Sequence, residues 1–233
     1  MAKKPWSITQ LLRFPAQCHL CNHYHKTNTA LCEQCKAYLM PLEYACEQCA
    51  HPLPNHTYGL CGQCIKYQPV FDKVVAPYAF EEPLRSLVHA YKYKQALHLQ
   101  AFMVELMLSK PPSDLYQTQC LIPMPIHKNR LKKRGFNQAS LLAKGLSKHT
   151  KIPYKNNLAS KIKDTPSQAE LNQQERRRNL RDVFVVEDTD DKHVTIIDDL
   201  LTTGSSANEL AKTLKKQGVN TVTVWCCARA SLD

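Results

Sequence analysis

Four Cys-x-x-Cys pairs in the first seventy residues constrain this chain more than any other feature. Stretches of ten, ten and eleven residues separate the pairs, which are Cys18/Cys21, Cys32/Cys35, Cys46/Cys49 and Cys61/Cys64. Each pair forms a tight knuckle that presents two thiolates to one ion, and two neighbouring knuckles complete a tetrahedral four-thiolate site. We therefore predict two structural zinc ions, bound in sequential order by Cys18, Cys21, Cys32 and Cys35 and by Cys46, Cys49, Cys61 and Cys64. A cross-braced arrangement that joins the first knuckle to the third stays open.

Disulfide bonds are the main alternative for these cysteines, and they require an oxidising compartment. The chain begins Met-Ala-Lys-Lys-Pro-Trp and has no apolar run long enough for a signal peptide, so we expect a cytoplasmic protein and favour zinc. Iron-sulfur and thiol-redox sites are weaker alternatives. Histidines also lie among the knuckles, but eight thiols already fill two sites, so we interpret the histidines as surface residues. They are His19, His23, His25, His51 and His56.

A change of pattern near residue 70 predicts two domains. The knuckles stop after Cys64, and Tyr67-Gln68-Pro69 interrupts the chain before an apolar, strand-like run begins. The chain has 233 residues, of which 43% are hydrophobic, and is long enough for one full core and a small module held together by metal. We expect a zinc-binding double ribbon at 1–70 and a second domain at 71–233. No run approaches the roughly 18 apolar residues of a membrane span.

Strand-like and helix-like segments alternate in the second domain. We predict strands at 74–80, 121–125, 183–186, 194–197 and 221–227, and helices at 84–108, 137–148 and 207–217. Short β-branched runs indicate the strands, and apolar residues at helical spacing indicate the helices. This alternation is typical of an α/β fold whose mostly parallel sheet is flanked by helices.

The segment 194–206 predicts a site for a phosphorylated ribose. Its apolar strand ends in Asp198 and Asp199, and the loop Thr202-Thr203-Gly204-Ser205-Ser206 then leads into a helix. Free backbone N–H groups at a helix N-terminus suit a phosphate. Carboxylates at the carboxyl end of a buried strand can accept hydrogen bonds from ribose hydroxyls and help to hold Mg²⁺.

This segment resembles the phosphoribosyl pyrophosphate (PRPP) motif of type I phosphoribosyltransferases, and Arg134-Gly135-Phe136 resembles their pyrophosphate loop. The resemblance implies that Mg²⁺ binds together with PRPP and that Asp198 and Asp199 are the catalytic acids. It also implies a PRPP-binding set made of Lys92, Lys94, Arg134, Gly135, Thr202, Thr203, Gly204, Ser205 and Ser206.

Basic residues are concentrated between residues 127 and 181. This stretch contains fifteen Lys or Arg and three acids, a surplus of twelve, whereas the whole chain has a net charge of +11. Such a surface attracts phosphate, which a sugar pyrophosphate and a nucleic acid both carry. For single-stranded DNA, the candidate contacts are Lys132, Lys133, Arg176 and Arg177.

Taken together, these features resemble the ComF family of competence-associated, phosphoribosyltransferase-like proteins. The matching segments are the double ribbon, 123–138, 165–179 and 198–204, where 165–179 corresponds to a loop that closes over substrate. The resemblance implies a protein required for natural transformation that binds PRPP with Mg²⁺ and single-stranded DNA, with a DNA-uptake helicase or recombination proteins as candidate partners. A phosphoribosyltransferase that acts on an unidentified acceptor without binding DNA is the alternative, and the motif does not decide whether turnover occurs.

Overall fold

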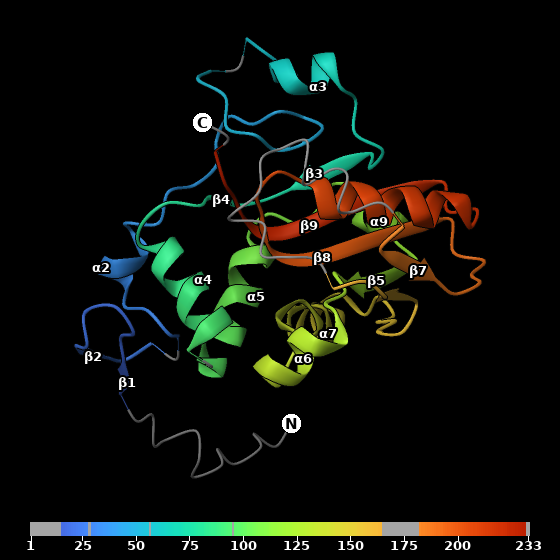
Figure 1. Ribbon diagram of the computed structural model, residues 1–233. Helices are drawn as coiled ribbons and strands as arrows, with labels where there is room; N and C mark the ends of the chain where they lie inside the picture. The colour runs from blue at the N-terminus through green and yellow to red at the C-terminus, as the bar shows by residue number, and fades with distance from the viewer. Residues whose placement is uncertain (1–14, 28, 56, 95, 165–181, 232–233) are drawn as a thin grey trace, which may run out of the picture.

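The computed structural model describes residues 15–27, 29–55, 57–94, 96–164 and 182–231 of the chain. It has a central parallel sheet with helices on both faces and a cysteine-rich N-terminal part packed against it (Figure 1). This confirms the predicted fold class, a mostly parallel α/β sheet preceded by a double ribbon.

The central sheet has the strand order β3-β9-β8-β5, and every neighbouring pair is parallel. Its strands are β3 (Lys73–Val75), β5 (Cys120–Pro123), β8 (His193–Leu201) and β9 (Thr221–Arg229), and β4 (Tyr78–Ala79) pairs with the end of β9. The predicted strand 74–80 is thus divided in two at Pro77, which has no N–H to donate to the sheet. Because β5 ends where Pro123 pairs with Ile197, β8 runs on past it from Asp198. That edge is the usual place for a ligand in an open parallel sheet.

Helices cover both faces of this sheet (Figure 1). One face carries α4 (Leu84–Tyr93), η1 (Leu97–Leu99), α5 (Gln100–Leu108) and α7 (Gln138–Thr150), and the other carries α9 (Ser205–Lys216). The prediction of one helix over 84–108 is wrong, since the chain breaks between α4 and α5. Ala96 leaves the α-helical region, with ψ of 61°, whereas the apolar residues on either side of it keep a helical spacing, so the sequence pattern did not reveal the break.

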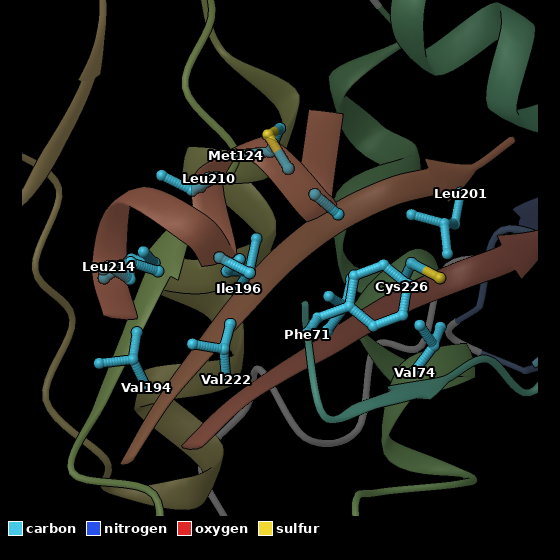
Figure 2. Packing of buried hydrophobic residues seen from close by; sticks show 14 of the residues in the cluster. Phe71, Val74, Met124, Val194, Ile196, Leu201, Leu210, Leu214, Val222 and Cys226 are labelled. Carbon is cyan, nitrogen blue, oxygen red and sulfur yellow. The ribbon is translucent and has the colours of Figure 1, made fainter. Parts of the chain in front are cut away.

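The core consists of two clusters, one on each face of the sheet, because successive side chains of a strand point to opposite faces. Val194 and Ile196 of β8 pack with Leu210 and Leu214 of α9, as Figure 2 shows. Ile197 belongs to the other cluster, with α5 and α7. Strands buried on both faces read as continuous apolar runs, which is why 194–197 was recognisable in the sequence.

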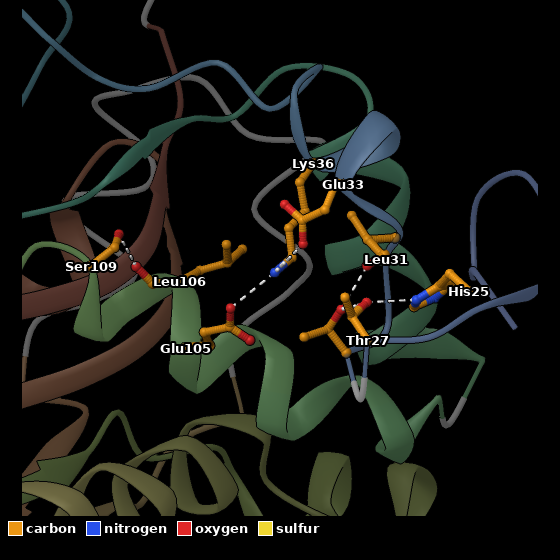
Figure 3. Close-up of polar contacts among 9 residues, drawn as sticks. His25, Thr27, Leu31, Glu33, Lys36, Glu105, Leu106 and Ser109 are labelled. Carbon is orange, nitrogen blue, oxygen red and sulfur yellow. Dashed lines mark hydrogen bonds and ion pairs between the residues drawn. The ribbon is translucent and has the colours of Figure 1, made fainter. Parts of the chain in front are cut away.

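The first ribbon contains β1 (Ala16–Gln17), β2 (Tyr24–His25) and α2 (Glu33–Lys36), and it lies beside α4 and α5. Lys36 Nζ lies 3.0 Å from Glu105 Oε1 of α5 (Figure 3). Within the ribbon, the Thr27 hydroxyl contacts His25 Nδ1 and the hydroxyl of Thr29, which donates to the carbonyl oxygen of Leu31. The second ribbon contains α3 (Gly62–Lys66) and lies at the β3–β9 side of the sheet. Both ribbons therefore pack on the sheet domain, and the boundary at residue 70 stays a prediction.

Of the remaining elements, η2 (Leu115–Gln117) lies at the amino ends of β5 and β8, and α6 (Lys128–Arg134) follows the carboxyl end of β5. The others are β6 (Ala159–Lys161) and β7 (Phe184–Val186), which form an antiparallel pair. The predicted strand 183–186 therefore pairs with β6 and does not join the central sheet. None of the helices in the described part of the chain has the length and apolarity that crossing a bilayer would require.

Candidate functional site

Two clusters of four cysteines form in the sequential order predicted. Within each cluster the sulfur atoms lie within 4.8 Å of one another, the first cluster being Cys18, Cys21, Cys32 and Cys35 and the second Cys46, Cys49, Cys61 and Cys64. All four cysteines of the second cluster are buried, whereas only Cys18 of the first cluster is. Four convergent thiolates are the donor set of a closed, structural zinc site. The cross-braced alternative is not the arrangement found, and no histidine of the described residues joins either cluster.

The segment predicted to bind a ribose phosphate lines a cavity of about 330 Å³ at the carboxyl edge of the sheet. This volume is within the range of small-molecule sites. The end of β8, the loop after it, the N-terminus of α9, α6, the end of α4 and the β6–β7 pair all contribute walls. From the predicted set, the cavity wall includes Lys92, Arg134, Asp198, Asp199, Thr202, Thr203, Gly204, Ser205 and Ser206.

The two acids differ in their surroundings because they are neighbours on one strand and point to opposite sheet faces. Asp199 is buried and faces α4, where its carboxylate lies 3.0 Å from Lys92 Nζ. Burial alone would favour the neutral amine, but the carboxylate of Asp199 raises the pKa of Lys92. Burial, and then the negative charge of Asp199, raise the pKa of Asp198 well above its usual value. The positive charge of Lys92 opposes this rise, yet no ion pair of the described residues includes Asp198.

The loop after β8 prepares the N-terminus of α9. Gly204 adopts a left-handed conformation, with φ of 74°, directly before the first residue of the helix. Thr203 Oγ1 lies 2.9 Å from Ser205 Oγ and accepts a hydrogen bond from the Ser205 N–H, which shapes the turn. The first N–H groups of a helix have no intrahelical partner, and the first residues of α9, Ser205, Ser206 and Ala207, line the cavity.

A basic wall faces the acids. Arg130 and Arg134 are one turn apart on α6 and both line the cavity. Arg134 Nη1 donates to Gln138 Oε1 at 2.7 Å, and its guanidinium lies over the ring of Tyr93. Lys161 of β6 completes the wall. Burial, and then the nearby Arg130, lower the pKa of Lys161 to about 8.

Four residues of the predicted sites lie elsewhere. Lys94 is exposed at the end of α4, because residues two apart on a helix face different sides and Lys92 takes the side toward the cavity. Gly135 ends α6 in a left-handed conformation, φ 85°, and so orients Arg134 without lining the cavity. Lys132 and Lys133 are exposed on α6 outside the cavity. Arg176 and Arg177, with the rest of 165–181, lie outside the described residues.

Several cavity residues had no assigned role in the sequence-based prediction, above all Lys161, and also Tyr93, His127, Arg130, Gln138 and Phe184. The helix α6 was not predicted either. Its signals were present, since His127 Nδ1 accepts from the N–H of Asn129 as an N-cap and Gly135 ends the helix. Nothing in the local sequence around Lys161 indicates a ligand, because the folding of β6 over the sheet edge is what brings it there.

The fold and the site together define an α/β protein with a parallel sheet, a cavity at its carboxyl edge and a double zinc ribbon. The family model described as "Double zinc ribbon domain" matches residues 9–65. Competence protein F of Haemophilus influenzae is 32% identical over 221 residues, covering 91% of this chain and 96% of its own. The chain therefore belongs to the competence protein F family, ComF.

More distant relatives also match over most of this chain and most of their own length. DNA utilization protein YhgH of Escherichia coli K12 is 27% identical, covering 91% of this chain and 89% of its own. Competence protein ComFC of Bacillus subtilis is 26% identical, covering 83% and 81%. A solved orotate phosphoribosyltransferase from Aeropyrum pernix superposes with a TM-score of 0.32 and 20% identity, covering 53% of this chain and 56% of that one. So loose a superposition carries no argument about this chain.

Proposed function

We propose that this protein is a cytoplasmic competence protein that binds PRPP with Mg²⁺ in the cavity and single-stranded DNA on the basic surface beside it. The observation that carries the proposal is the cavity itself. Two acids of β8, a helix N-terminus with hydroxyls and a basic wall all line it. The names of the relatives, competence protein F and DNA utilization protein, support a role in natural transformation.

Each wall of the cavity suits one part of PRPP. The Thr203–Ser205 turn and the N-terminus of α9 would bind the 5′-phosphate, and Asp198 would accept hydrogen bonds from the ribose hydroxyls. Lys92, Arg134 and Lys161 would face the pyrophosphate, where arginine can bind two oxygens at once. Mg²⁺ prefers carboxylate and phosphate oxygens and would bring positive charge to Asp198.

Titration calorimetry tests this assignment directly. We expect PRPP to bind with one site per chain when Mg²⁺ is present, and ribose 5-phosphate to bind more weakly because it leaves the basic wall empty. If PRPP produced no binding heat with folded, zinc-loaded protein at any of several temperatures, PRPP would not be the ligand of this cavity.

The pKa of Lys161 predicts a pH dependence for this binding. The amine loses its charge as the pH rises through about 8, while Lys92, whose pKa is raised, keeps its charge. We expect PRPP affinity to fall between pH 7 and pH 9 in the wild-type protein. Lys161→Arg stays charged across this range and should remove most of the fall. An identical pH profile in both proteins would show that Lys161 does not face the ligand.

For the DNA surface we expect an electrostatic, sequence-independent affinity. Lys132 and Lys133 are exposed on α6, beside the cavity and free to reach a phosphate backbone. The logarithm of affinity should fall with the logarithm of salt by about 0.7 for each phosphate neutralised on a single strand. Lys132→Ala with Lys133→Ala should therefore flatten this slope by about 1.4.

A matched control makes the salt experiment specific. Lys148 and Lys216 lie at the far ends of α7 and α9, which both begin at the cavity, and both are exposed. Lys148→Ala with Lys216→Ala removes the same charge and should leave the slope unchanged. The slopes can be measured by fluorescence anisotropy with unstructured oligonucleotides. If the two double variants gave equal slopes, DNA would not bind at Lys132 and Lys133.

The second candidate function is a phosphoribosyltransferase that acts on an unidentified acceptor and does not bind DNA. Carboxylates at the ribose position favour it, because they would stabilise the positive charge that develops on the sugar as pyrophosphate leaves. Two results together would favour this function over the first. The protein would release pyrophosphate from PRPP when a small-molecule fraction is added, and labelled DNA would show no anisotropy change at low salt. A helicase or recombination protein as a further partner belongs to the first function.

A further inference from the structure

Arg229, the last residue of β9, has an unusual environment. Its side chain is 2% exposed, and its Nε donates to the carbonyl oxygen of Cys49, 2.8 Å away, in the second cysteine cluster. Its Nη1 donates to the carbonyl oxygens of Leu201, Thr202 and Ala230. One guanidinium thus connects the third knuckle to the end of β8 and the start of the loop that lines the cavity.

No acid of the described residues balances the charge of Arg229. Among the ion pairs found in the described residues, none includes Arg229. A buried charge without a partner is costly, and carbonyl dipoles compensate only part of that cost. Zinc with four thiolates carries a net charge of about minus two. The second cysteine cluster, all of it buried, would supply the negative charge that Arg229 needs.

Other contacts hold the same two parts together. Phe71, which follows the second ribbon, lies under the loop, 3.5 Å from where a side chain on Gly204 would begin. The N–H of Val70 donates to Asn208 Oδ1 of α9 at 2.6 Å. A cavity of about 480 Å³ on this side is lined by Cys49 and Cys64 as well as by Thr203, Gly204 and Ser205. The ribbon therefore supports the loop from behind.

We propose that Arg229 is a positioning residue that couples the second zinc centre to the phosphate-binding loop, so that zinc occupancy and PRPP binding stabilise each other. The coupling rests on the proposed binding of PRPP. It is specific to the second centre, since the first ribbon packs on α5 through Lys36 and Glu105 and belongs to the core cluster on the other face of the sheet. Linkage makes such coupling reciprocal, and measured couplings between sites are typically about 5 to 150-fold.

Cysteine alkylation followed by peptide mass spectrometry reads each zinc centre separately in the intact protein. We expect saturating PRPP with Mg²⁺ to slow alkylation of Cys46, Cys49, Cys61 and Cys64 by about fivefold or more. Alkylation of Cys18, Cys21, Cys32 and Cys35 should not change, which provides an internal control. Equal rates at the second centre with and without bound PRPP would overturn the coupling.

Variants of Arg229 supply the second arm. Arg229→Lys keeps the charge, but one ammonium group cannot span carbonyls on both sides, so we expect PRPP affinity to fall about tenfold and the protection to vanish. Lys36→Met removes a cation from the first ribbon and should change neither. Unchanged affinity and protection in Arg229→Lys would overturn the role of Arg229. If either variant fails to melt cooperatively, the effect of PRPP on cysteine alkylation in the wild-type protein decides whether the second zinc centre and the loop are coupled.

A ligand-free measurement separates this inference from the proposed function. Arg229→Met leaves the second centre without its cation, so its thiols should be alkylated severalfold faster than in the wild-type protein, relative to those of the first centre. If calorimetry shows no PRPP binding, the proposed ligand fails while this result still supports Arg229 as the charge partner of the zinc centre. If the relative rates do not change, Arg229 is not its partner, whatever the ligand.

Discussion

Replacement of Asp198 by Asn is expected to weaken binding of Mg²⁺ and PRPP at least about a hundredfold without lowering the melting temperature. The carboxylate would accept hydrogen bonds from the ribose hydroxyls and attract the metal. Loss of such charge-assisted contacts typically costs about 3 kcal/mol, which corresponds to roughly a hundredfold in affinity. Stability should not fall, because burial and Asp199 already disfavour the ionised carboxyl. Removing a strained charge tends to stabilise a fold.

The sign of this stability effect can be checked by pH. The pKa of Asp198 in the folded protein is raised above the unfolded value of 3.8, so the native state keeps the proton of this carboxyl to a higher pH than the unfolded state does. Stability from this group is therefore present below the unfolded pKa and is lost as the pH rises through the raised one. Asp198→Asn should lose that part of the pH dependence. The control Asp188→Asn, on an exposed residue, should change neither affinity nor melting temperature.

Asp199→Asn should behave differently from its neighbour. It removes the carboxylate that Lys92 faces at 3.0 Å and leaves a largely enclosed ammonium without its partner. We expect a loss of stability of about 1 to 3 kcal/mol together with weaker PRPP binding. If calorimetry and thermal melts gave the same result for both variants, the different roles inferred for the two acids would be wrong.

The sequence was most informative where chemistry and periodicity coincide. The eight knuckle cysteines, the strand before Asp198 and the helix after Gly204 were each recognisable from spacing alone. The cysteine clusters and the helix lie where expected, and the predicted strand 194–197 is part of a longer strand that continues through both acids to Leu201. Local signals of this kind do not depend on the rest of the chain. A knuckle needs its own two cysteines, and a buried parallel strand needs a short apolar run.

Features that depend on contacts distant in sequence could not be predicted. Lys161 reaches the cavity because β6 pairs with β7, and their pairing joins residues more than twenty positions apart. Arg229 looks like the polar end of a strand, yet it is buried between a knuckle and the loop. Lys94 illustrates the opposite error. Two lysines two residues apart seemed equivalent, and only the rotation of α4 assigns Lys92 to the cavity.

Metal removal is expected to produce the largest change of all. We expect two zinc ions per chain by plasma mass spectrometry, and loss of the cooperative melt when strong chelator removes both. Structural zinc contributes about 10 to 16 kcal/mol of folding free energy in small domains, whereas whole domains are stable by about 5 to 15 kcal/mol. The loss of even one embedded ion is therefore comparable to the total stability.

The two centres should not contribute equally to that loss. Cys46, Cys49, Cys61 and Cys64 belong to the same core cluster as Phe71, Val74 and the inner residues of β8, β9 and α9. The first centre lies at the margin of the other cluster, with only Cys18 fully enclosed. Cys64→Ser should abolish the cooperative transition and the near-ultraviolet signal of buried Trp225. Cys35→Ser should lose one zinc ion but keep the cooperative transition and the Trp225 signal, at a lower melting temperature. The reverse order would mean that the first ribbon is the one on which the sheet depends.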